Sequence, residues 1–266
     1  MWHQRIFGLK YAAERGSEFQ LVCDDDISFE TDFAERMMEE MSANDADLLA
    51  PHIGQFTTKN SSLPLRFFNG FLGGRYESNN ANFKYYVSII PTAGHVLHRK
   101  IKGNTNLTQS AAFNCFMMDP SCLNAMKLDE EYWLDDTAYA FPDDQVFFYK
   151  AYRLGLKVMH CNAPFICHLD HGSSAPDRRK KAAFANGRNF LIFWHRFLWK
   201  PLDNAGQRLL YLCGITYRCL AHIAFNSLLS IVKRRNTLTP YLKGIRSGLS
   251  YIKSDKYKAL DTIPRK

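Results

Sequence analysis

The chain has 266 residues, of which 46% are hydrophobic and 23% are charged. This length suits one large domain, or one domain with an appendage, and the composition excludes an intrinsically disordered chain. The net charge of +8 is unevenly distributed, because residues 178–266 hold 19 Lys and Arg but only 3 Asp and Glu. Such a basic part indicates an anionic partner (a membrane surface, a nucleic acid or a phosphorylated substrate) or a merely solvated surface.

The seven cysteines are scattered along the chain, and no two of them form a C-x-x-C pair. This pattern predicts neither a disulfide framework nor a zinc site, and it favours a reducing compartment. The N-terminal residues Met1 to Arg5 lack the apolar core of a signal peptide. We therefore expect a cytoplasmic protein.

The first predicted elements alternate between helix and strand. Residues 8–14 read as the end of a helix that closes near Gly16. The short apolar run 19–23 predicts a buried strand, and it stops at three aspartates. Residues 32–41 predict a helix with an acidic first turn, and residues 48–50 predict a second buried strand.

The middle of the chain is less regular. Residues 54–103 are rich in Asn, Gly, Ser and aromatic residues, which predicts an irregular insertion. Within it, residues 85–90 and 94–98 predict the two strands of a hairpin. Regular structure returns with an apolar strand over 111–118, and Asp119-Pro120-Ser121 is typical of the start of a helix.

The last part of the α/β pattern begins with a helix over 143–154, which Pro142 and two acids open and Gly155 ends. Residues 157–160 and 165–168 predict strands, and the chain is helical from residue 182 onward. This order of elements predicts an α/β fold with its substrates at the carboxyl ends of the strands.

Residues 209–232 form the longest apolar stretch and raise the question of a membrane span. Arg218, His222 and Asn226 interrupt the stretch, and a charge at the centre of a membrane helix costs roughly 2.5–3.5 kcal/mol on insertion scales. We therefore predict no transmembrane span. Together with the basic residues 233–235, the stretch fits an amphipathic helix on anionic lipid. A soluble helix packed on the body of the protein fits equally well.

Three adjacent carboxylates, Asp24, Asp25 and Asp26, directly follow the first strand. They repel one another unless a cation or water screens them. Mg²⁺ and Mn²⁺ usually bind one or two carboxylates together with substrate phosphates. Alternate residues of an extended segment face the same way, so Asp24 and Asp26 can converge on an ion while Asp25 points elsewhere. The alternative is an acidic turn that caps the following helix.

Asp143 and Asp144 form a second acidic pair, at the start of a predicted helix. Capping of the helix requires only one of the two. The other is then available as a general base, whose carboxylate must reach a hydroxyl of the acceptor.

His168 and His171 form an H-x-x-H motif that Gly-Ser-Ser follows. A single histidine after a strand is usually structural, but this combination is typical of a loop that contacts phosphate or metal. Arg178 and Arg179 follow shortly after. They are placed to neutralise a diphosphate, although a solvated basic turn also explains them.

In this order the motifs resemble the inverting family-two glycosyltransferases of GT-A fold. The segment Arg5-x-x-Gly8-Leu9-x-x-Ala12, then a strand and three aspartates, is similar to the R-N-x-G segment and D-x-D strand end of that family. Ile6 stands where the family usually has Asn. The resemblance extends over residues 134–174, with Asp-Asp where Glu-Asp is common, and over Asn186-x-Arg188-Asn189 in the helix that follows.

The resemblance covers about residues 1–200, and it implies a Rossmann-like GT-A domain with a mostly parallel sheet flanked by helices. Residues 201–266 would be a basic amphipathic helical extension. Family members begin with about two strand–helix units that bind the base and ribose, and this chain starts after them, so we expect an N-terminally incomplete domain. The implied activity is metal-dependent transfer of a sugar, with inversion, from a nucleotide-sugar donor to a glycan or lipid-linked acceptor, as in cell-surface polysaccharide synthesis.

The resemblance also assigns roles to individual residues. Asp24 and Asp26 would bind the Mn²⁺ or Mg²⁺ that bridges the donor diphosphate, and His168 or His171 would be a third contact to metal or phosphate. Asp144, or Asp143 if the register differs, would be the base that deprotonates the acceptor. The remaining contacts to the donor would come from Arg5, Gly8, Asp25, Asn114, Arg178 and Arg179.

Two other classes of function remain as alternatives. The first is a non-catalytic glycosyltransferase remnant that binds glycan or a protein partner, because the units that bind the nucleotide precede the matched region in the family. The second is a metal-dependent nuclease or phosphotransferase, which would need carboxylates converging on two metal ions. A metal-type strand end with a separate base favours sugar transfer, and we expect no nucleic acid partner.

Overall fold

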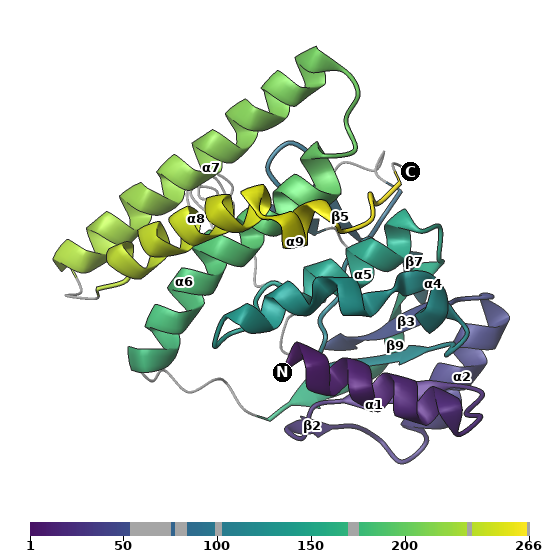
Figure 1. Ribbon diagram of the computed structural model, residues 1–266. Coiled ribbons are helices and arrows are strands. Elements are labelled where there is room, and N and C mark those ends of the chain that lie inside the picture. The colour runs from purple at the N-terminus through teal and green to yellow at the C-terminus, as the bar shows by residue number, and fades with distance from the viewer. Residues whose placement is uncertain (54–75, 78–83, 99–102, 170–175, 233–235, 265–266) are drawn as a thin grey trace.

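The computed structural model is a mixed α/β structure in which a group of long helices lies beside a sheet (Figure 1). It describes residues 1–53, 76–77, 84–98, 103–169, 176–232 and 236–264. The described helices are α1 (Trp2–Glu14), α2 (Phe33–Ala43), α4 (Cys122–Met126), α5 (Asp143–Arg153), α6 (Pro176–Phe193), α7 (Ala205–Val232), α8 (Leu238–Lys253) and α9 (Asp255–Lys258), with the 3₁₀ segment η2 (Leu128–Asp136) and the π-helical segment η3 (Trp194–Trp199). The described strands are β1 (Gln20–Cys23), β2 (Ile27–Ser28), β3 (Leu48–Ile53), β4 (Tyr76–Glu77), β5 (Val87–Ile90), β6 (His95–His98), β7 (Thr105–Leu107), β8 (Cys115–Met118) and β9 (Val158–His168).

The larger sheet has six strands in the order β1-β8-β3-β9-β2, with β7 also paired to β9. The prediction of an α/β fold is confirmed, but the expected mostly parallel pairing is not. In this sheet only β3 and β9 pair in parallel, because β8 runs antiparallel between β1 and β3, and β2 and β7 run antiparallel along β9. Since β8 opposes both of its neighbours, β1, β3 and β9 still share one direction, and their carboxyl ends point toward the same edge.

Helices cover both faces of this sheet. Successive side chains of a strand point to opposite sides, so an apolar strand presents apolar side chains on both faces. Leu48 and Ala50 of β3 belong to the core on the side of α1 and α5. Leu49 and Ile53 belong to a separate core on the side of α2. The apolar strands of the sequence are therefore buried on both faces, which is the layered arrangement of an α/β protein.

Other expected elements appear with changed limits. The predicted hairpin is confirmed as β5 and β6, which pair antiparallel in a small sheet with β4. The strand expected over 111–118 is shorter, because only 115–118 joins the ladder. The two strands expected over 157–160 and 165–168 are one strand, β9, with an irregularity in its pairing to β3. All seven cysteines are free thiols in the structure, and the sulfur atoms of Cys23 and Cys115 lie 2.9 Å apart.

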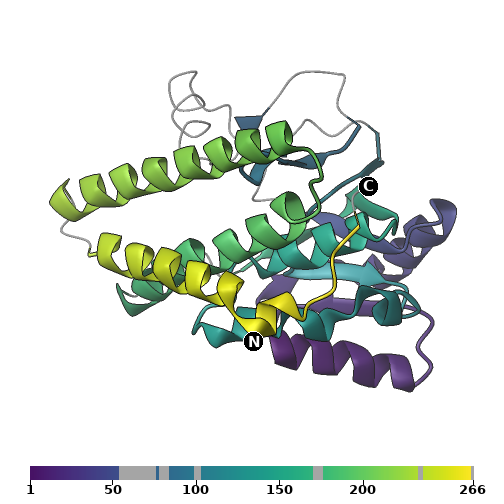
Figure 2. The ribbon, with the colours of Figure 1, turned by 45° about the horizontal axis from the view of Figure 1, so that its top comes forward.

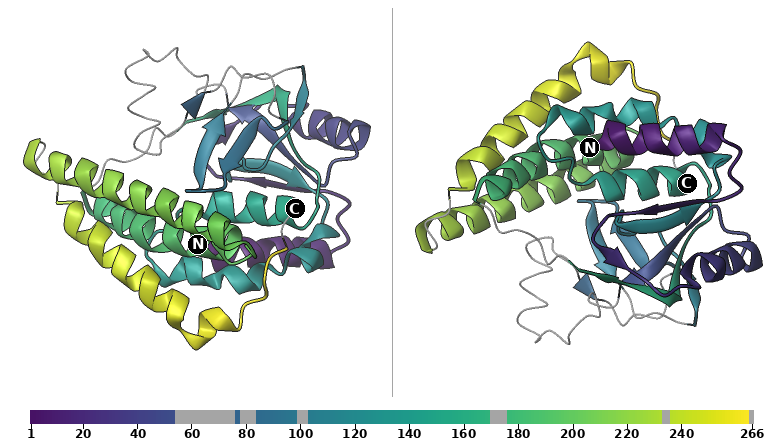
Figure 3. Two further views of the ribbon diagram at one scale, coloured as in Figure 1. Left: turned by 90° about the horizontal axis from the view of Figure 1, so that it is seen from above. Right: turned by 90° about the horizontal axis from the view of Figure 1, so that it is seen from below.

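The helices α6, α7 and α8 lie together beside the sheet (Figure 3). The boundary expected at residues 200/201 falls in the turn between η3 and α7, and α8 beyond it packs closely on α6 before it. Glycines make this approach possible: a Cβ at Gly187 would overlap the carbonyl oxygen of Tyr241, and one at Gly244 would overlap that of Phe184. Residues 201–266 therefore share an interface with the preceding part of the chain, although the division into two domains stays a prediction.

A buried ion cluster joins η2, α5 and η3. Glu131 is fully buried, and its carboxylate accepts hydrogen bonds from Lys150 Nζ at 2.7 Å and from Arg196 Nε at 3.0 Å. Glu130 lies beside it and binds the same two cations. Because the members satisfy one another away from water, the cluster fixes α5 against the helical part of the protein.

By length and composition, α7 could cross a membrane: its most apolar window has a mean hydropathy of 1.3, and 17% of that window is buried. Its polar residues face inward, since Arg218 and Asn226 are buried against the body. The apolar residues face outward, with Leu220 60% and Ile231 78% exposed. Figure 2 shows α7 along one side of the helical group and α8 along the other. The residues that interrupt the apolar stretch are therefore those that dock the helix.

Candidate functional site

Arg5 joins the two acidic motifs that the sequence singles out. Its guanidinium donates to Asp143 Oδ2 at 2.8 Å and to Asp24 Oδ1 at 3.1 Å. The same group lies 4.4 Å above the centroid of the Phe113 ring, which holds the side chain in place between the two carboxylates. The structure thus brings the end of β1 and the start of α5 to one place, although they are far apart in the sequence.

Arg5 does not fully compensate the negative charge of the carboxylates around it. Burial raises the pKa of Asp24 above its ordinary value; Arg5 opposes this rise, and the nearby Asp26 and Asp143 add to it. Burial also raises the pKa of Asp143 against the effect of Arg5. Three neighbouring carboxylates around one guanidinium form a site of net negative charge, which favours a bound cation.

The turn between β1 and β2 lies beside two other predicted site segments. The backbone N–H of Asp24 donates to the carbonyl of Asn114 at 2.8 Å, and that of Leu169 donates to the carbonyl of Asp26 at 2.7 Å. Ile27 in β2 pairs with His168 in β9. The backbone of His168 therefore lies next to Asp26, whereas His171 lies outside the described residues.

The residues at this edge fit a cation that is shared with a phosphate. Among the residues that the structure describes, no three His, Cys, Asp or Glu side chains form a complete cage for a metal ion. For Mg²⁺ or Mn²⁺ bound here, Asp24 and Asp26 would supply the one or two carboxylates that such an ion typically takes from a protein, and substrate phosphates and water would complete the shell. Asp25 is exposed on the same turn.

Three other residues predicted to contact the nucleotide-sugar are Arg178, Arg179 and Gly8. Arg178 is exposed at the start of α6, with its guanidinium 5.9 Å from the ring of Tyr139, which belongs to the segment leading into α5. Arg179 is half-buried beside it. Gly8 is exposed on the outer face of α1, with open space around it.

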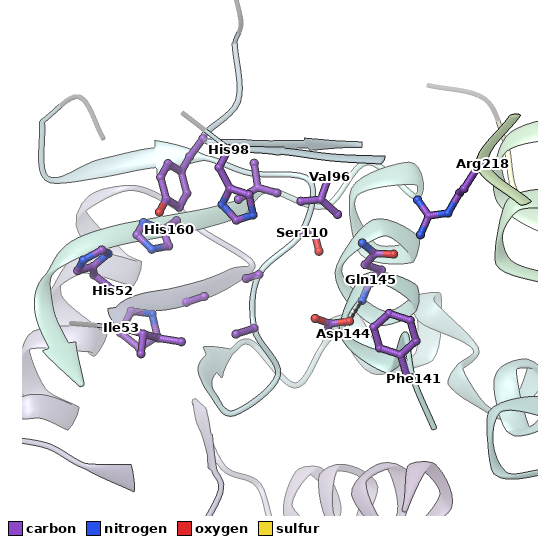
Figure 4. A pocket seen from close by; sticks show the side chains of 16 residues that line it. His52, Ile53, Val96, His98, Ser110, Phe141, Asp144, Gln145, His160 and Arg218 are labelled. Carbon is purple, nitrogen blue, oxygen red and sulfur yellow. Dashed lines mark hydrogen bonds between the residues drawn. The ribbon is translucent and has the colours of Figure 1, made fainter. Parts of the chain in front are cut away.

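A cavity of about 280 Å³ lies between the carboxyl end of β3, the small sheet, the start of α5 and α7 (Figure 4). Its apolar wall includes Val87, Val96 and Phe141. Polar side chains also line it: His52, His98, Ser110, Asp144, Gln145, His160 and Arg218. Asp144 and Asp143 are therefore divided between two environments, because Asp144 lines the cavity while Asp143 binds Arg5.

The segment 110–114 connects the cavity to the acidic edge. Ser110, Ala111 and Ala112 line the cavity, Phe113 lies under Arg5, and Asn114 accepts the hydrogen bond from Asp24. This is the reason why the expected strand over 111–118 begins only at Cys115: the preceding residues leave the ladder and form the wall between the two parts of the site.

Several cavity residues do not follow from the sequence motifs. Burial lowers the pKa of His160 to about 3, with His52 and His98 contributing, and burial also lowers the pKa of His52. The imidazole of His160 is therefore neutral at pH 7. Only Arg218 could have been noticed in the sequence, because it is a charged residue inside an apolar stretch. The direction in which its side chain points depends on how α7 packs, which no local pattern specifies.

Comparison with known proteins gives no assignment. No protein-family model matches the sequence, and no curated protein matches it significantly.

Proposed function

We propose that the protein is a metal-dependent glycosyltransferase that moves a sugar, with inversion, from a nucleotide-sugar to a glycan or lipid-linked acceptor. The observation that carries this proposal is the bridge from Asp24 through Arg5 to Asp143, with the adjacent Asp144 in the cavity. This bridge brings the carboxylates at the end of β1, which suit a metal ion bound to a diphosphate, close to the start of α5, where Asp144 suits the role of general base. Metal-dependent sugar transfer with inversion uses both groups at one site.

In this proposal the residues have separate tasks. Asp24 and Asp26 hold Mn²⁺ or Mg²⁺, which when bound neutralises the charge of the leaving diphosphate. Asp144 takes the proton of an acceptor hydroxyl as its oxygen bonds to the anomeric carbon and the bond from that carbon to the diphosphate breaks. Arg5 positions Asp24 and Asp143, and Arg178 lies on the side from which a basic residue can approach the diphosphate.

The finer fold assignment, a GT-A domain, belongs to the same proposal. It is supported by the shared direction of β1, β3 and β9, whose carboxyl ends point toward the edge where Asp24 follows β1. Ligands of open α/β sheets bind outside the carboxyl ends of the strands. Helices on both faces of the sheet also agree with this fold.

Release of nucleoside diphosphate from UDP-, GDP- and dTDP-sugars in the presence of Mn²⁺ tests the activity. We expect release from at least one donor, and a reduction of about 10²–10⁴-fold in Asp144→Asn, the range typical of general bases. Glu18→Gln, an exposed carboxylate at the opposite end of β1, is the matched control. If no donor reacts in the unaltered protein, the non-catalytic alternative replaces this proposal.

We propose further that α7 rests on an anionic membrane surface, where a lipid-linked acceptor would be found. Its outward Leu209, Leu220 and Ile231 supply apolar surface, and the 19 Lys and Arg in residues 178–266 supply the charge. We expect the chain to co-sediment with phosphatidylglycerol vesicles but not with phosphatidylcholine vesicles, and Leu220→Gln with Ile231→Gln to abolish the effect. Equal recovery with and without anionic vesicles would contradict this part.

A further inference from the structure

Arg218 is a buried cation without an acidic partner among the described residues. Its side chain is 7% exposed and lines the cavity. Its guanidinium lies 3.4 Å from the centroid of the Phe190 ring and makes a long hydrogen bond, 3.5 Å, to the carbonyl of Ala93. A buried charge is costly unless an opposite charge pairs with it, and neither of these contacts supplies one.

The sequence offers few acids that could neutralise Arg218 from outside the described residues. Segments 54–75, 78–83 and 99–102, which belong to the same region of the chain as the cavity strands, contain no Asp or Glu. The acids whose side chains the structure does not describe are Glu77, Asp170 and Asp177. Among the side chains that the structure describes, no carboxylate belongs to the groups that act electrostatically on Arg218.

Two buried histidines, His95 and His222, lie beside Arg218. Burial, and next the charge of Arg218, lower the pKa values of His95 and His222 to about 4. The Nε2 atoms of both are buried and have no hydrogen-bond partner among the described residues. Two neutral imidazoles next to an unpaired guanidinium create a local environment that favours an anion.

The cavity is also lined by buried polar atoms that form no hydrogen bond within the described residues. Gln145 is 8% exposed and His160 is 6% exposed, yet Gln145 Oε1 and His160 Nδ1 have no hydrogen-bond partner among the described residues. Leaving a buried polar atom without a hydrogen bond is unfavourable, and a ligand with hydroxyl groups would form hydrogen bonds to both atoms. In the view of Figure 4, Gln145 lies between Asp144 and Arg218.

From this arrangement we propose that the cavity binds an acidic sugar, whose carboxylate or phosphate pairs with Arg218 while its hydroxyls reach Gln145 and Asp144. The inference rests on the proposed function: if Asp144 is the base, the acidic sugar is the acceptor. The acceptor class would then be a uronate-containing or phosphate-bearing glycan, and α7 would supply a binding residue to the site as well as a surface. The volume of about 280 Å³ is sufficient for one sugar ring.

Binding of three small probes to the full chain, measured by calorimetry or ligand-observed NMR, tests the proposal. The probes are D-glucuronate, D-glucose 1-phosphate and neutral D-glucose. We expect one of the two anions to bind at least about tenfold more tightly than glucose, because a charge-assisted hydrogen bond contributes about 1.5–3 kcal/mol. The preferred anion identifies a uronate or a phosphate as the group on the acceptor. Equal or undetectable binding of all three overturns the proposal.

Arg218→Met and Arg218→Lys separate a binding role from a structural one. Methionine removes a buried unpaired charge, so we expect an unchanged or higher unfolding temperature without ligand, together with loss of the preference for the anion. Lysine keeps the charge and should retain part of that preference. A large fall in unfolding temperature of Arg218→Met, with the preference for the anion intact, would show that Arg218 serves only packing.

The failure of this inference is distinguishable from failure of the proposed function. Asp26→Asn should weaken Mn²⁺-dependent binding of a nucleoside diphosphate and leave the preference for the anionic sugar unchanged. If nucleotide binding depends on Asp26 but the anions bind no better than glucose, the transferase proposal stands and the acidic acceptor is wrong.

Discussion

Replacement of Arg5 by methionine tests the electrostatic arrangement of the acidic edge. The change removes two ion pairs, at 2.8 Å to Asp143 and 3.1 Å to Asp24, and keeps most of the apolar stem over Phe113. A hydrogen bond to a charged group contributes about 1.5–3 kcal/mol when buried. The side chains of Asp143 and Asp24 are 17% and 35% exposed, so solvent reduces each contribution, and we expect a total loss of about 2–4 kcal/mol in the free energy of unfolding.

The pH dependence of this loss is a sharper test than its size. Burial already raises the pKa values of Asp24 and Asp143 in the folded protein, and Arg5 opposes that rise. Without Arg5 both pKa values rise further, so the variant carries two poorly compensated carboxylates at pH 7. As the pH falls through the raised pKa values these groups become protonated, and the destabilisation should shrink.

Urea unfolding of the variant and the unaltered protein, followed by tryptophan fluorescence at pH 7 and at acidic pH, measures both effects. Arg15→Met is the matched control, because Arg15 is exposed near the end of the same helix and contacts only Tyr11 among the described residues. We expect it to change stability by less than about 0.5 kcal/mol. A change of that size in Arg5→Met, or a loss that is equal at both pH values, would refute the reasoning.

Further predictions concern the packing of the fold. Glu131→Gln leaves Lys150 and Arg196 as buried cations without a full counter-charge, so we expect a loss of about 3–5 kcal/mol in urea unfolding. Although burial opposes it, the two cations lower the pKa of Glu131, so in the unaltered protein this stabilisation should be complete above the ordinary pKa of an unfolded glutamate and should be lost progressively as the pH falls below it toward the lowered folded value; a contribution that stays constant below about pH 4 would contradict it. Gly244→Val should reduce stability by about 1–3 kcal/mol or more because its side chain overlaps the α6 backbone. Gly8→Ala, on the exposed face of α1, should instead raise stability by about 0.5–1 kcal/mol, and equal effects of the two substitutions would contradict the packing.

Elements with strong local signals could be predicted from the sequence. Helix α5 lies between Pro142 and Leu154 as its proline, acids and glycine predict, and the hairpin of β5 and β6 also follows its local pattern. The position of β8 could not be predicted, because an antiparallel strand between β1 and β3 is set by contacts between residues distant in the chain. The apolar pattern of a buried strand carries no information about the direction of its neighbours.

The candidate site divides in the same way. The sequence identifies Asp24, Asp143 and Asp144 by residue type and position, but it does not show which of the two α5 aspartates enters the cavity. That choice depends on the Arg5 bridge to Asp143. The role of Arg218 was equally inaccessible, because a charge within an apolar stretch can face solvent, lipid or a cavity, and only the packing of α7 decides among them.

The central claim is that the acidic edge holds a divalent cation together with a diphosphate. Electron paramagnetic resonance of Mn²⁺, titrated into the full chain with and without UDP, GDP or dTDP, measures this directly. We expect Mn²⁺ binding that at least one nucleotide strengthens, that Asp26→Asn weakens by about tenfold or more, and that Glu18→Gln leaves unchanged. Mn²⁺ binding that is absent with every nucleotide, or that is the same in Asp26→Asn, would contradict it.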